Sequence, residues 1–255
     1  MSDIPVAWHW GAVDARYHGP HETRLTHRDA ACDLWVRNDR LAAGRGYAAA
    51  PATARRELAH VGAILRLRGR GRYHLHASGA VAPEGRAWLL AGDSGAGKST
   101  LAYSLARAGW RVLGDDTVIL EMSGRGLIAH PWHAPLQVSS ILAVHFPEIA
   151  SRQPDSARID RRARVPMPVE RACASPVMGI TILERAASCR VELLSPVVAL
   201  AMLIRQSPWV AIDDEASRAH LDVLRHIAAV LPVVRMSHTP AELSTFGRAL
   251  TEMVA

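Results

Sequence analysis

The chain has 255 residues, of which 49% are hydrophobic and 21% charged, with a formal net charge of +6. This balance is that of a globular protein long enough to bury a core, and it excludes a disordered or fibrous chain. No apolar run reaches the roughly 18 residues of a membrane-spanning helix. The three cysteines have no paired spacing, which excludes a disulfide framework and a zinc site.

The N-terminus lacks a basic region followed by an apolar core, so we expect no signal peptide and a cytoplasmic protein. Only one of the thirty basic residues is a lysine, Lys98, and the arginines are scattered along the chain. No aromatic-rich nucleic-acid motif accompanies the arginines, so a solvated surface is favoured over a nucleic-acid partner. The alternative is an acidic partner such as phosphate or a peptide carboxylate.

Hydrophobic periodicity predicts a strand-rich start followed by alternating helices and strands. Gly44, Gly46 and Pro51 mark a break after the first segment. Up to Gly109 the predicted elements are strands at 6–10 and 33–37, a helix at 52–67, strands at 73–81 and 87–91, and a helix at 98–108.

The second half continues the alternation. Its predicted elements are a strand at 110–113 resumed at 117–120, a hairpin turn at 123–126, a strand at 127–130, a helix near 139–144, a strand at 178–183, helices at 196–206 and 214–230, a strand at 233–236 and a last helix from about Thr239. Residues 151–171 carry several arginines and are predicted to be a flexible basic loop. The alternation predicts an α/β fold with a mixed or parallel sheet flanked by helices.

A glycine-rich loop lies between a predicted strand and a predicted helix. Its sequence, Gly-Asp-Ser-Gly-Ala-Gly-Lys-Ser, matches the phosphate-binding pattern G-x-x-x-x-G-K-[ST] of P-loop proteins. Backbone N–H groups and the helix dipole make such a loop an anion site fitted to a triphosphate. The sequence therefore predicts ATP and Mg²⁺ as cofactors, although the loop does not read the base. The predicted nucleotide contacts are Gly92, Asp93, Ser94, Gly95, Ala96, Gly97, Lys98, Ser99 and Thr100.

Two of these side chains have distinct expected tasks. The thin stem of Lys98 is expected to reach the β- and γ-phosphates, where the wide fork of an arginine does not fit. The Ser99 hydroxyl is expected to bind Mg²⁺.

Asp115 and Asp116 follow the next predicted strand, where ligands gather in open α/β sheets. One carboxylate is expected to hold Mg²⁺, and the other to accept the proton of an attacking hydroxyl. Adjacent side chains on a strand point to opposite faces, so both serve one site only if Gly114 bends the chain. The alternative is a turn with two solvated carboxylates.

Two histidine pairs are further candidates. His74 and His76 have strand spacing, and His130 and His133 flank Pro131. Ordinary surface or core histidines are the favoured interpretation, unless the fold places them beside the glycine-rich loop.

Together these residues resemble the HPr kinase/phosphorylase family over about residues 70–145. The resemblance rests on the loop, on Arg-Val-Leu-Gly-Asp-Asp at 111–116, and on His76 within Leu-His-Ala-Ser-Gly at 75–79. It implies an HPr-kinase-like P-loop kinase core in which Asp115 is the base for a serine hydroxyl. It further implies that Asp116 assists or contacts Mg²⁺ and that His76 orients Asp115. We expect one domain over 1–255, with residues 1–70 packed on a kinase core at 71–255.

The chain also departs from that family. It lacks a Glu-Ile-Arg-Gly-type segment, and its N-terminal region is too short for the usual regulatory domain, which argues against HPr as the substrate and against a phosphorylase activity. The remaining pattern is similar to short HPr-kinase-like enzymes, some of which phosphorylate a C-terminal serine of a lasso-peptide precursor. The arginines of 151–171 would then bind a peptide carboxylate or phosphate.

The predicted function is thus ATP-dependent phosphorylation of a serine in a peptide or small protein. Two alternatives stay open: a small-metabolite kinase, and a non-catalytic, nucleotide-dependent peptide-binding protein. No nucleic-acid or membrane partner is expected, and a homo-oligomer stays open.

Overall fold

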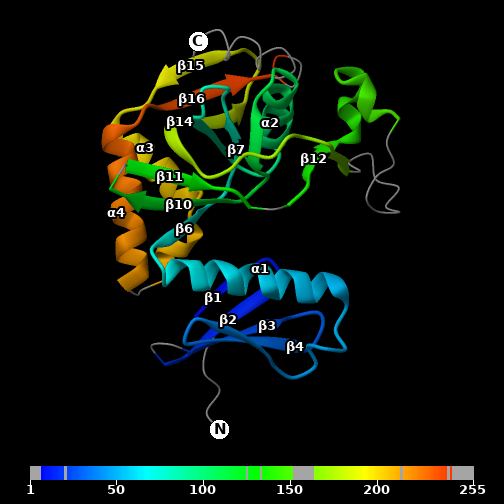
Figure 1. Ribbon diagram of the computed structural model, residues 1–255, viewed down its shortest axis with the longest axis vertical. Coiled ribbons are helices and arrows are strands. Elements are labelled where there is room, and N and C mark those ends of the chain that lie inside the picture. Colours follow the sequence, from blue (N-terminus) through cyan, green and yellow to red (C-terminus); the bar gives the residue numbers. More distant parts are fainter. Residues whose placement is uncertain are drawn as a thin grey trace. The chain divides into compact units, whose positions relative to one another are not determined.

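The protein is described from a computed structural model, which covers residues 7–19, 22–124, 126–132, 134–151, 164–212, 215–239 and 242 (Figure 1). The chain forms two compact units. The first combines Met1–Tyr73 with Trp209–His220, and the second combines His74–Pro208 with Leu221–Ala255. That residues 1–70 pack on a core at 71–255 as one domain stays a prediction.

The first unit contains a five-stranded antiparallel sheet whose strands follow sequence order. The strands are β1 (Trp8–Trp10), β2 (Val13–Gly19), β3 (Glu22–His27), β4 (Cys32–Arg37) and β5 (Arg40–Ala43). Only two strands were expected here. The others were not predicted; β3, for example, has Leu25 as its only apolar residue, and it buries Leu25 and His27 but not Thr26 between them.

Helix α1 (Ala52–Arg68) packs on strands β2 to β5 of this sheet and confirms the predicted helix. Its buried face carries Leu58, Val61 and Ile64, with the spacing expected of an amphipathic helix. Gly62 lies on the same side, and a Cβ there would stand 2.9 Å from the Leu41 side chain. The glycine therefore lets α1 approach the sheet closely.

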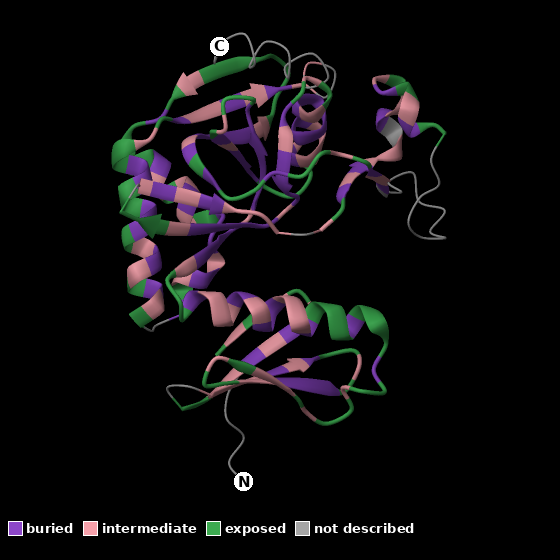
Figure 2. Ribbon diagram, in the orientation of Figure 1, coloured by how far each residue is buried: buried purple, intermediate pink, exposed green. Residues whose placement is uncertain are grey.

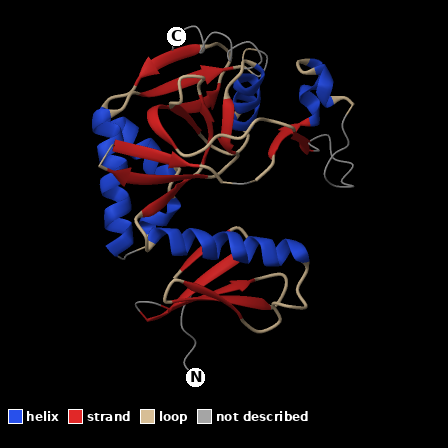
Figure 3. Cartoon of the chain, viewed as in Figure 1, coloured by secondary structure: helices blue, strands red, loops and turns tan. Residues whose placement is uncertain are grey.

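The second unit contains a nine-stranded mixed sheet within the described residues, in the order β6-β10-β11-β14-β8-β7-β9, with β16 beside β14 and β15 beside β16 (Figure 3). Strand β14 is parallel to β8 and β16 and antiparallel to β11. The predicted α/β class with a mixed sheet and flanking helices is therefore confirmed. The strands are β6 (Arg72–Leu75), β7 (Ala77–Val81), β8 (Ala87–Ala91), β9 (Arg111–Gly114), β10 (Val118–Ser123), β11 (Gly126–His130), β14 (Ser175–Arg185), β15 (Arg190–Leu193) and β16 (Val233–His238).

Helices and a small ribbon complete the described chain. They are α2 (Lys98–Arg107), α3 (Pro196–Arg205), α4 (Glu215–Val230), the 3-10 helices η1 (Ser140–Val144), η2 (Pro147–Ile149) and η3 (Pro208–Ala211), and the antiparallel pair β12 (Leu136–Ser139) and β13 (Arg164–Met167). No helix among the described residues is both long enough and apolar enough to cross a membrane.

Two predictions in this region need correction. The helix expected near 139–144 is a 3-10 helix, because Pro147 follows too closely for an α-helix to develop. The expected loop at 151–171 contains strand β13, whose buried Val165 and Met167 alternate across Pro166. Residues 152–163 and nearly all of the expected last helix lie outside the described residues.

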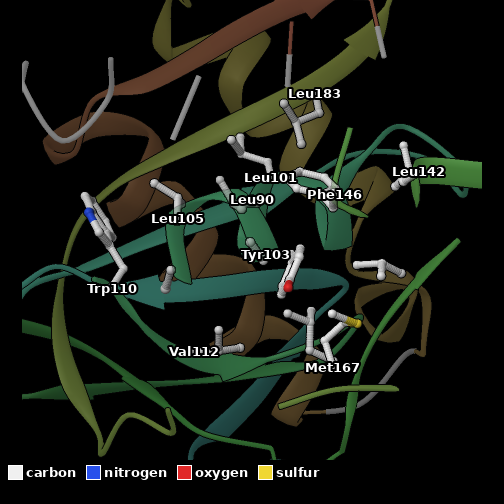
Figure 4. Packing of buried hydrophobic residues seen from close by; sticks show 14 of the residues in the cluster. Leu90, Leu101, Tyr103, Leu105, Trp110, Val112, Leu142, Phe146, Met167 and Leu183 are labelled. Carbon is white, nitrogen blue, oxygen red and sulfur yellow. The ribbon is translucent and has the colours of Figure 1, made fainter. Parts of the chain in front are cut away.

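An apolar core lies around α2, which packs on β7, β8 and β9 (Figure 4). Leu101 and Leu105 of the helix and Leu90 of β8 are fully buried there, together with Trp110. Burying one such leucine stabilises a fold by about 1.5–3 kcal/mol. The buried colouring of the central strands in Figure 2 shows the same core.

Strand order decides where the functional residues meet. Strand β7 lies between β8 and β9 and is antiparallel to both, with Ala77 opposite Ala91 and Gly79 opposite Gly114. The start of β7 therefore lies beside the carboxyl ends of β8 and β9. The segment before β7, the glycine-rich loop after β8 and the two aspartates after β9 converge at this edge of the sheet.

Candidate active site

The glycine-rich loop joins β8 to α2, and its glycines have backbone angles that other residues rarely adopt. Gly97 caps α2 with φ +105, and Gly92 has φ +142. A Cβ on Gly92 would stand 2.6 Å from the Leu183 carbonyl oxygen of β14. Ser94 and Gly95 are exposed, Ala96 is buried and Thr100 is half-buried in the first turn of α2. The loop thus places the start of α2, with the backbone N–H groups of its first turn, at the sheet edge.

Lys98 folds back into this loop and is only 4% exposed. Its Nζ donates to the carbonyl oxygens of Gly92 at 2.9 Å and Asp93 at 3.3 Å. The same ammonium lies 3.0 Å from His76 Nε2 and 3.5 Å from an Asp116 carboxylate oxygen. A buried ammonium needs such partners because desolvation of a lone charge is costly.

His76 stands at a break between β6 and β7, where a single strand at 73–81 had been expected. Because Lys98 can only donate, His76 Nε2 accepts, and the Nδ1–H donates to the Asp116 carbonyl oxygen at 3.1 Å. Burial, followed by the nearby Lys98 charge, lowers the pKa of His76 below its ordinary value. The neutral ring is therefore the form that suits this position.

Asp115 is 7% exposed and accepts three hydrogen bonds. Ser99 donates from 2.7 Å and Ser78 from 2.9 Å to one carboxylate oxygen, and the Gln137 backbone N–H donates to the other from 3.0 Å. Burial, followed by the charge of Asp116, raises the pKa of Asp115, and the three hydrogen bonds oppose this rise. The carboxylate is held rigidly against the first turn of α2.

Asp116 has a different environment from its neighbour. Its φ is +58, a left-handed conformation that is uncommon outside glycine, and its side chain is 41% exposed. This bend, together with the end of β9 at Gly114, turns Asp116 toward Lys98 while Asp115 faces Ser99. Both carboxylates therefore lie at one site, which a regular strand would not allow.

Further side chains hold the loop from outside. Arg205 donates to one carboxylate oxygen of Asp93 from 2.9 Å, and the Gln206 amide donates to the other from 3.1 Å. Buried His238, at the end of β16, lies 2.7 Å from the Ala96 carbonyl oxygen. Sequence reasoning missed these contacts and Gln137, because nothing local to Gln206, His238 or Gln137 indicates them. Ser78 could have been found, because it lies two residues beyond His76.

Ser99 and Asp115 supply oxygen atoms, the kind of ligand that hard divalent cations prefer. Among the described residues, no group of three or more His, Cys, Asp and Glu side chains is suited to hold a metal. Ser99 Oγ and an Asp115 oxygen are 2.7 Å apart. Neighbouring ligands of an octahedral Mg²⁺ at about 2.0–2.1 Å stand about 2.9 Å apart. Mg²⁺ commonly takes one or two protein oxygens and completes its shell with phosphates and water.

The other histidine candidates lie differently. His74 is fully buried and belongs to β6, on the far side of the break at His76. His130 is 2.6 Å from Glu121 across the β10–β11 hairpin, and His133 lies outside the described residues. These observations favour ordinary roles for His74 and His130.

No protein-family model matches the chain, and no curated protein matches it. Among solved structures it is similar to the Hpr(Ser) kinase/phosphatase from Coxiella burnetii, with 14% sequence identity and a TM-score of 0.38. The alignment covers 71% of this chain and 94% of that chain. A likeness of this size assigns neither a family nor an activity.

Proposed function

We propose that this protein is an ATP-dependent kinase that phosphorylates a serine hydroxyl of a peptide or small protein. The observation that carries the proposal is the convergence of one buried lysine, two carboxylates and a neutral histidine behind a glycine-rich loop at one sheet edge. Lys98 has contacts with His76 and Asp116, and Ser99 has a contact with Asp115. A phosphoryl transferase needs these groups, because its catalysis is mainly positioning and charge stabilisation.

In this proposal the loop and Lys98 hold the triphosphate. The N–H groups at the start of α2 face the phosphates, and the Lys98 ammonium exchanges its carbonyl partners for phosphate oxygens. Neutral His76 keeps one lone pair toward Lys98, which guides the ammonium without adding a second positive charge. Arginine at position 98 would be too wide for this arrangement.

The hydrogen bonds support a division of labour between the aspartates that reverses the sequence-based assignment. Asp115 is buried, and its three hydrogen bonds hold it against Ser99 and away from solvent, where a substrate hydroxyl would approach. Asp116 is the more exposed of the two carboxylates, with 41% of its side chain accessible to solvent on the side from which a substrate would approach. We therefore propose Asp116 as the group that accepts the serine proton.

Ser99 and Asp115 would hold Mg²⁺ once ATP is bound, and the cation would supply charge neutralisation at the β- and γ-phosphates. Gln137 and Ser78 keep Asp115 oriented toward Ser99 through their hydrogen bonds. In this proposal the two protein ligands do not fill the coordination shell of Mg²⁺, and phosphate oxygens of the nucleotide would complete it.

The acceptor is proposed from the sequence resemblance. The specific candidate for the acceptor is a serine near the C-terminus of a lasso-peptide precursor. We propose that the kinase itself is cytoplasmic. Light scattering would show whether it forms a homo-oligomer. The arginine-rich segment would contribute charge for a peptide carboxylate or phosphate, although residues 152–163 lie outside the described part of the chain.

Incubation with ATP, Mg²⁺ and serine-containing precursor peptides tests the proposal. We expect ADP release and a peptide that gains one phosphate in mass spectrometry, whereas a Ser→Ala peptide gains none. Lys98→Ala is the enzyme control. ADP release with small hydroxyl metabolites only would favour a metabolite kinase. Nucleotide binding without transfer, retained when both aspartates are neutralised, would favour a binding protein.

A further inference from the structure

The C-terminal end of α3 contacts both segments that surround Lys98. Gln206 follows the last residue of α3, and its backbone carbonyl accepts the His76 N–H at 2.8 Å. Its side-chain amide donates to Asp93 Oδ1 at 3.1 Å. One residue thus contacts the segment before β7 and the glycine-rich loop after β8.

These two segments supply most partners of the Lys98 ammonium. The Asp93 carbonyl oxygen and His76 Nε2 accept from Lys98 at 3.3 and 3.0 Å. A shift of either segment would therefore move an acceptor away from the ammonium. Gln206 ties both segments to the same helix end.

Burial distinguishes Gln206 from the neighbouring contact to Asp93. Gln206 is only 6% exposed, whereas the side chains of Arg205 and Asp93 are 61% and 69% exposed. Exposed ion pairs contribute little because water and salt screen them. Gln206 is buried, so less water competes at its end of the hydrogen bond, and loss of the bond would leave a buried amide without this partner.

We infer that Gln206 is a positioning residue whose side chain acts through Asp93 to hold the glycine-rich loop beside Lys98, while its backbone carbonyl contacts the His76 segment. The inference rests on the proposed nucleotide-dependent function. According to this inference, the C-terminal end of α3 holds the glycine-rich loop in its binding conformation in the nucleotide-free protein.

A double-mutant cycle tests this assignment. Gln206→Met keeps the side chain's length and removes the donor, Asp93→Ala removes the acceptor, and Arg205→Met is the matched neighbour. ATP affinity is measured for each variant and for the Gln206→Met, Asp93→Ala double variant. We expect Gln206→Met to weaken binding about 3- to 10-fold, the loss of one buried hydrogen bond. Arg205→Met should change affinity by less than about 2-fold.

The double variant should be no worse than Asp93→Ala alone, because contacting residues are non-additive. Additive losses would show that Gln206 acts elsewhere and would overturn the inference. A general loss of stability would not produce this coupling.

Hydrogen exchange of the loop amides from Gly92 to Gly97, in nucleotide-free protein, separates this inference from the proposed function. We expect about 3- to 10-fold faster exchange in Gln206→Met and in Asp93→Ala, and little change in Arg205→Met. If the wild-type protein binds no ATP but the variants show the expected exchange pattern, the proposed function is refuted and the positioning role of Gln206 stands. Unchanged exchange would refute the positioning role even if ATP binds. Should Gln206→Met fail to fold, exposed Asp93 makes Asp93→Ala the deciding variant.

Discussion

The two ends of helix α2 bury opposite kinds of side chain. At its start Lys98 and Ser99 contact carbonyl oxygens, His76 and carboxylates. About one turn later Leu101, and about two turns later Leu105, lie fully buried in an apolar cluster (Figure 4). Burial of a charge opposes folding unless it is fully paired, whereas burial of leucine favours folding. The comparison teaches that the first turn of α2 buries a charge that needs several polar partners, whereas the rest of the helix contributes apolar burial that stabilises the fold.

We expect the largest effect from substitution of Lys98 at the polar end of α2. Lys98→Ala should leave no detectable phosphoryl transfer while the far-UV circular dichroism spectrum stays native, because the apolar end of α2 is untouched. Lys98→Arg should fail as well, since the guanidinium is wider than the ammonium. ATP turnover and circular dichroism decide both. Turnover retained by Lys98→Ala would mean that the loop has no part in the reaction.

Substitution of Asp115 and Asp116 one at a time separates two functions at the polar end of α2. Asp116→Asn should bind ATP and Mg²⁺ almost normally and lose about 10²–10⁴-fold in single-turnover rate, the usual cost of removing a general base. Asp115→Asn should instead raise the Mg²⁺ concentration needed for half-maximal rate. Mg²⁺ titrations of both variants test this. Exchanged phenotypes would restore Asp115 as the base, and full activity in both would refute a kinase mechanism.

Substitution at the apolar end of α2 should lower stability and leave nucleotide affinity nearly unchanged. Leu105→Ala should lower the free energy of unfolding by about 2–5 kcal/mol, through lost burial and the cavity left behind. ATP affinity measured well below the melting temperature should stay within about 2-fold of wild type, because Leu105 touches the core and not the loop. Urea unfolding and nucleotide titration provide the two values. A large change in affinity with unchanged stability would contradict the division between the two ends.

The smallest expected effect concerns His76. His76→Ala should slow phosphoryl transfer about 10–100-fold, as removal of a supporting partner commonly does. Because burial and the Lys98 charge lower its pKa, the folded protein's His76 gains its proton at a lower pH than the same residue in the unfolded chain. The unfolded chain gains that proton sooner, so this group makes stability fall as pH drops below about 6.5.

Rate profiles between pH 5 and 8 test the histidine. Exposed His226 in α4 is the matched control, and His226→Ala should leave the profile unchanged. His74 is unsuitable as a control because it is fully buried. An unchanged profile in His76→Ala would remove this histidine from the mechanism.

The sequence alone determined the local part of the candidate site. The spacing of Gly92, Gly97, Lys98 and Ser99 requires a strand, a tight turn and a helix start, and these are what the chain forms. The apolar spacing likewise predicted α1 and α2 within a few residues, and the helices predicted at 196–206 and 214–230 correspond to α3 and α4. Such features depend on near neighbours in the chain, which the sequence contains. Strand β3 of the first unit was not predicted, because Leu25 is its only apolar residue and one such residue sets no period.

Only the tertiary structure decided how the site is completed. The insertion of β7 between β8 and β9 brings His76 and Ser78 to Lys98 and Asp115, and no local pattern encodes strand order. The contacts of Gln206 with Asp93 and of Gln137 with Asp115 join segments distant in sequence. The different burial of Asp115 and Asp116 also follows from these packings. Adjacent identical residues carry no sequence signal to tell them apart, and their distinct hydrogen bonds and solvent exposure arise only when the sheet closes around them.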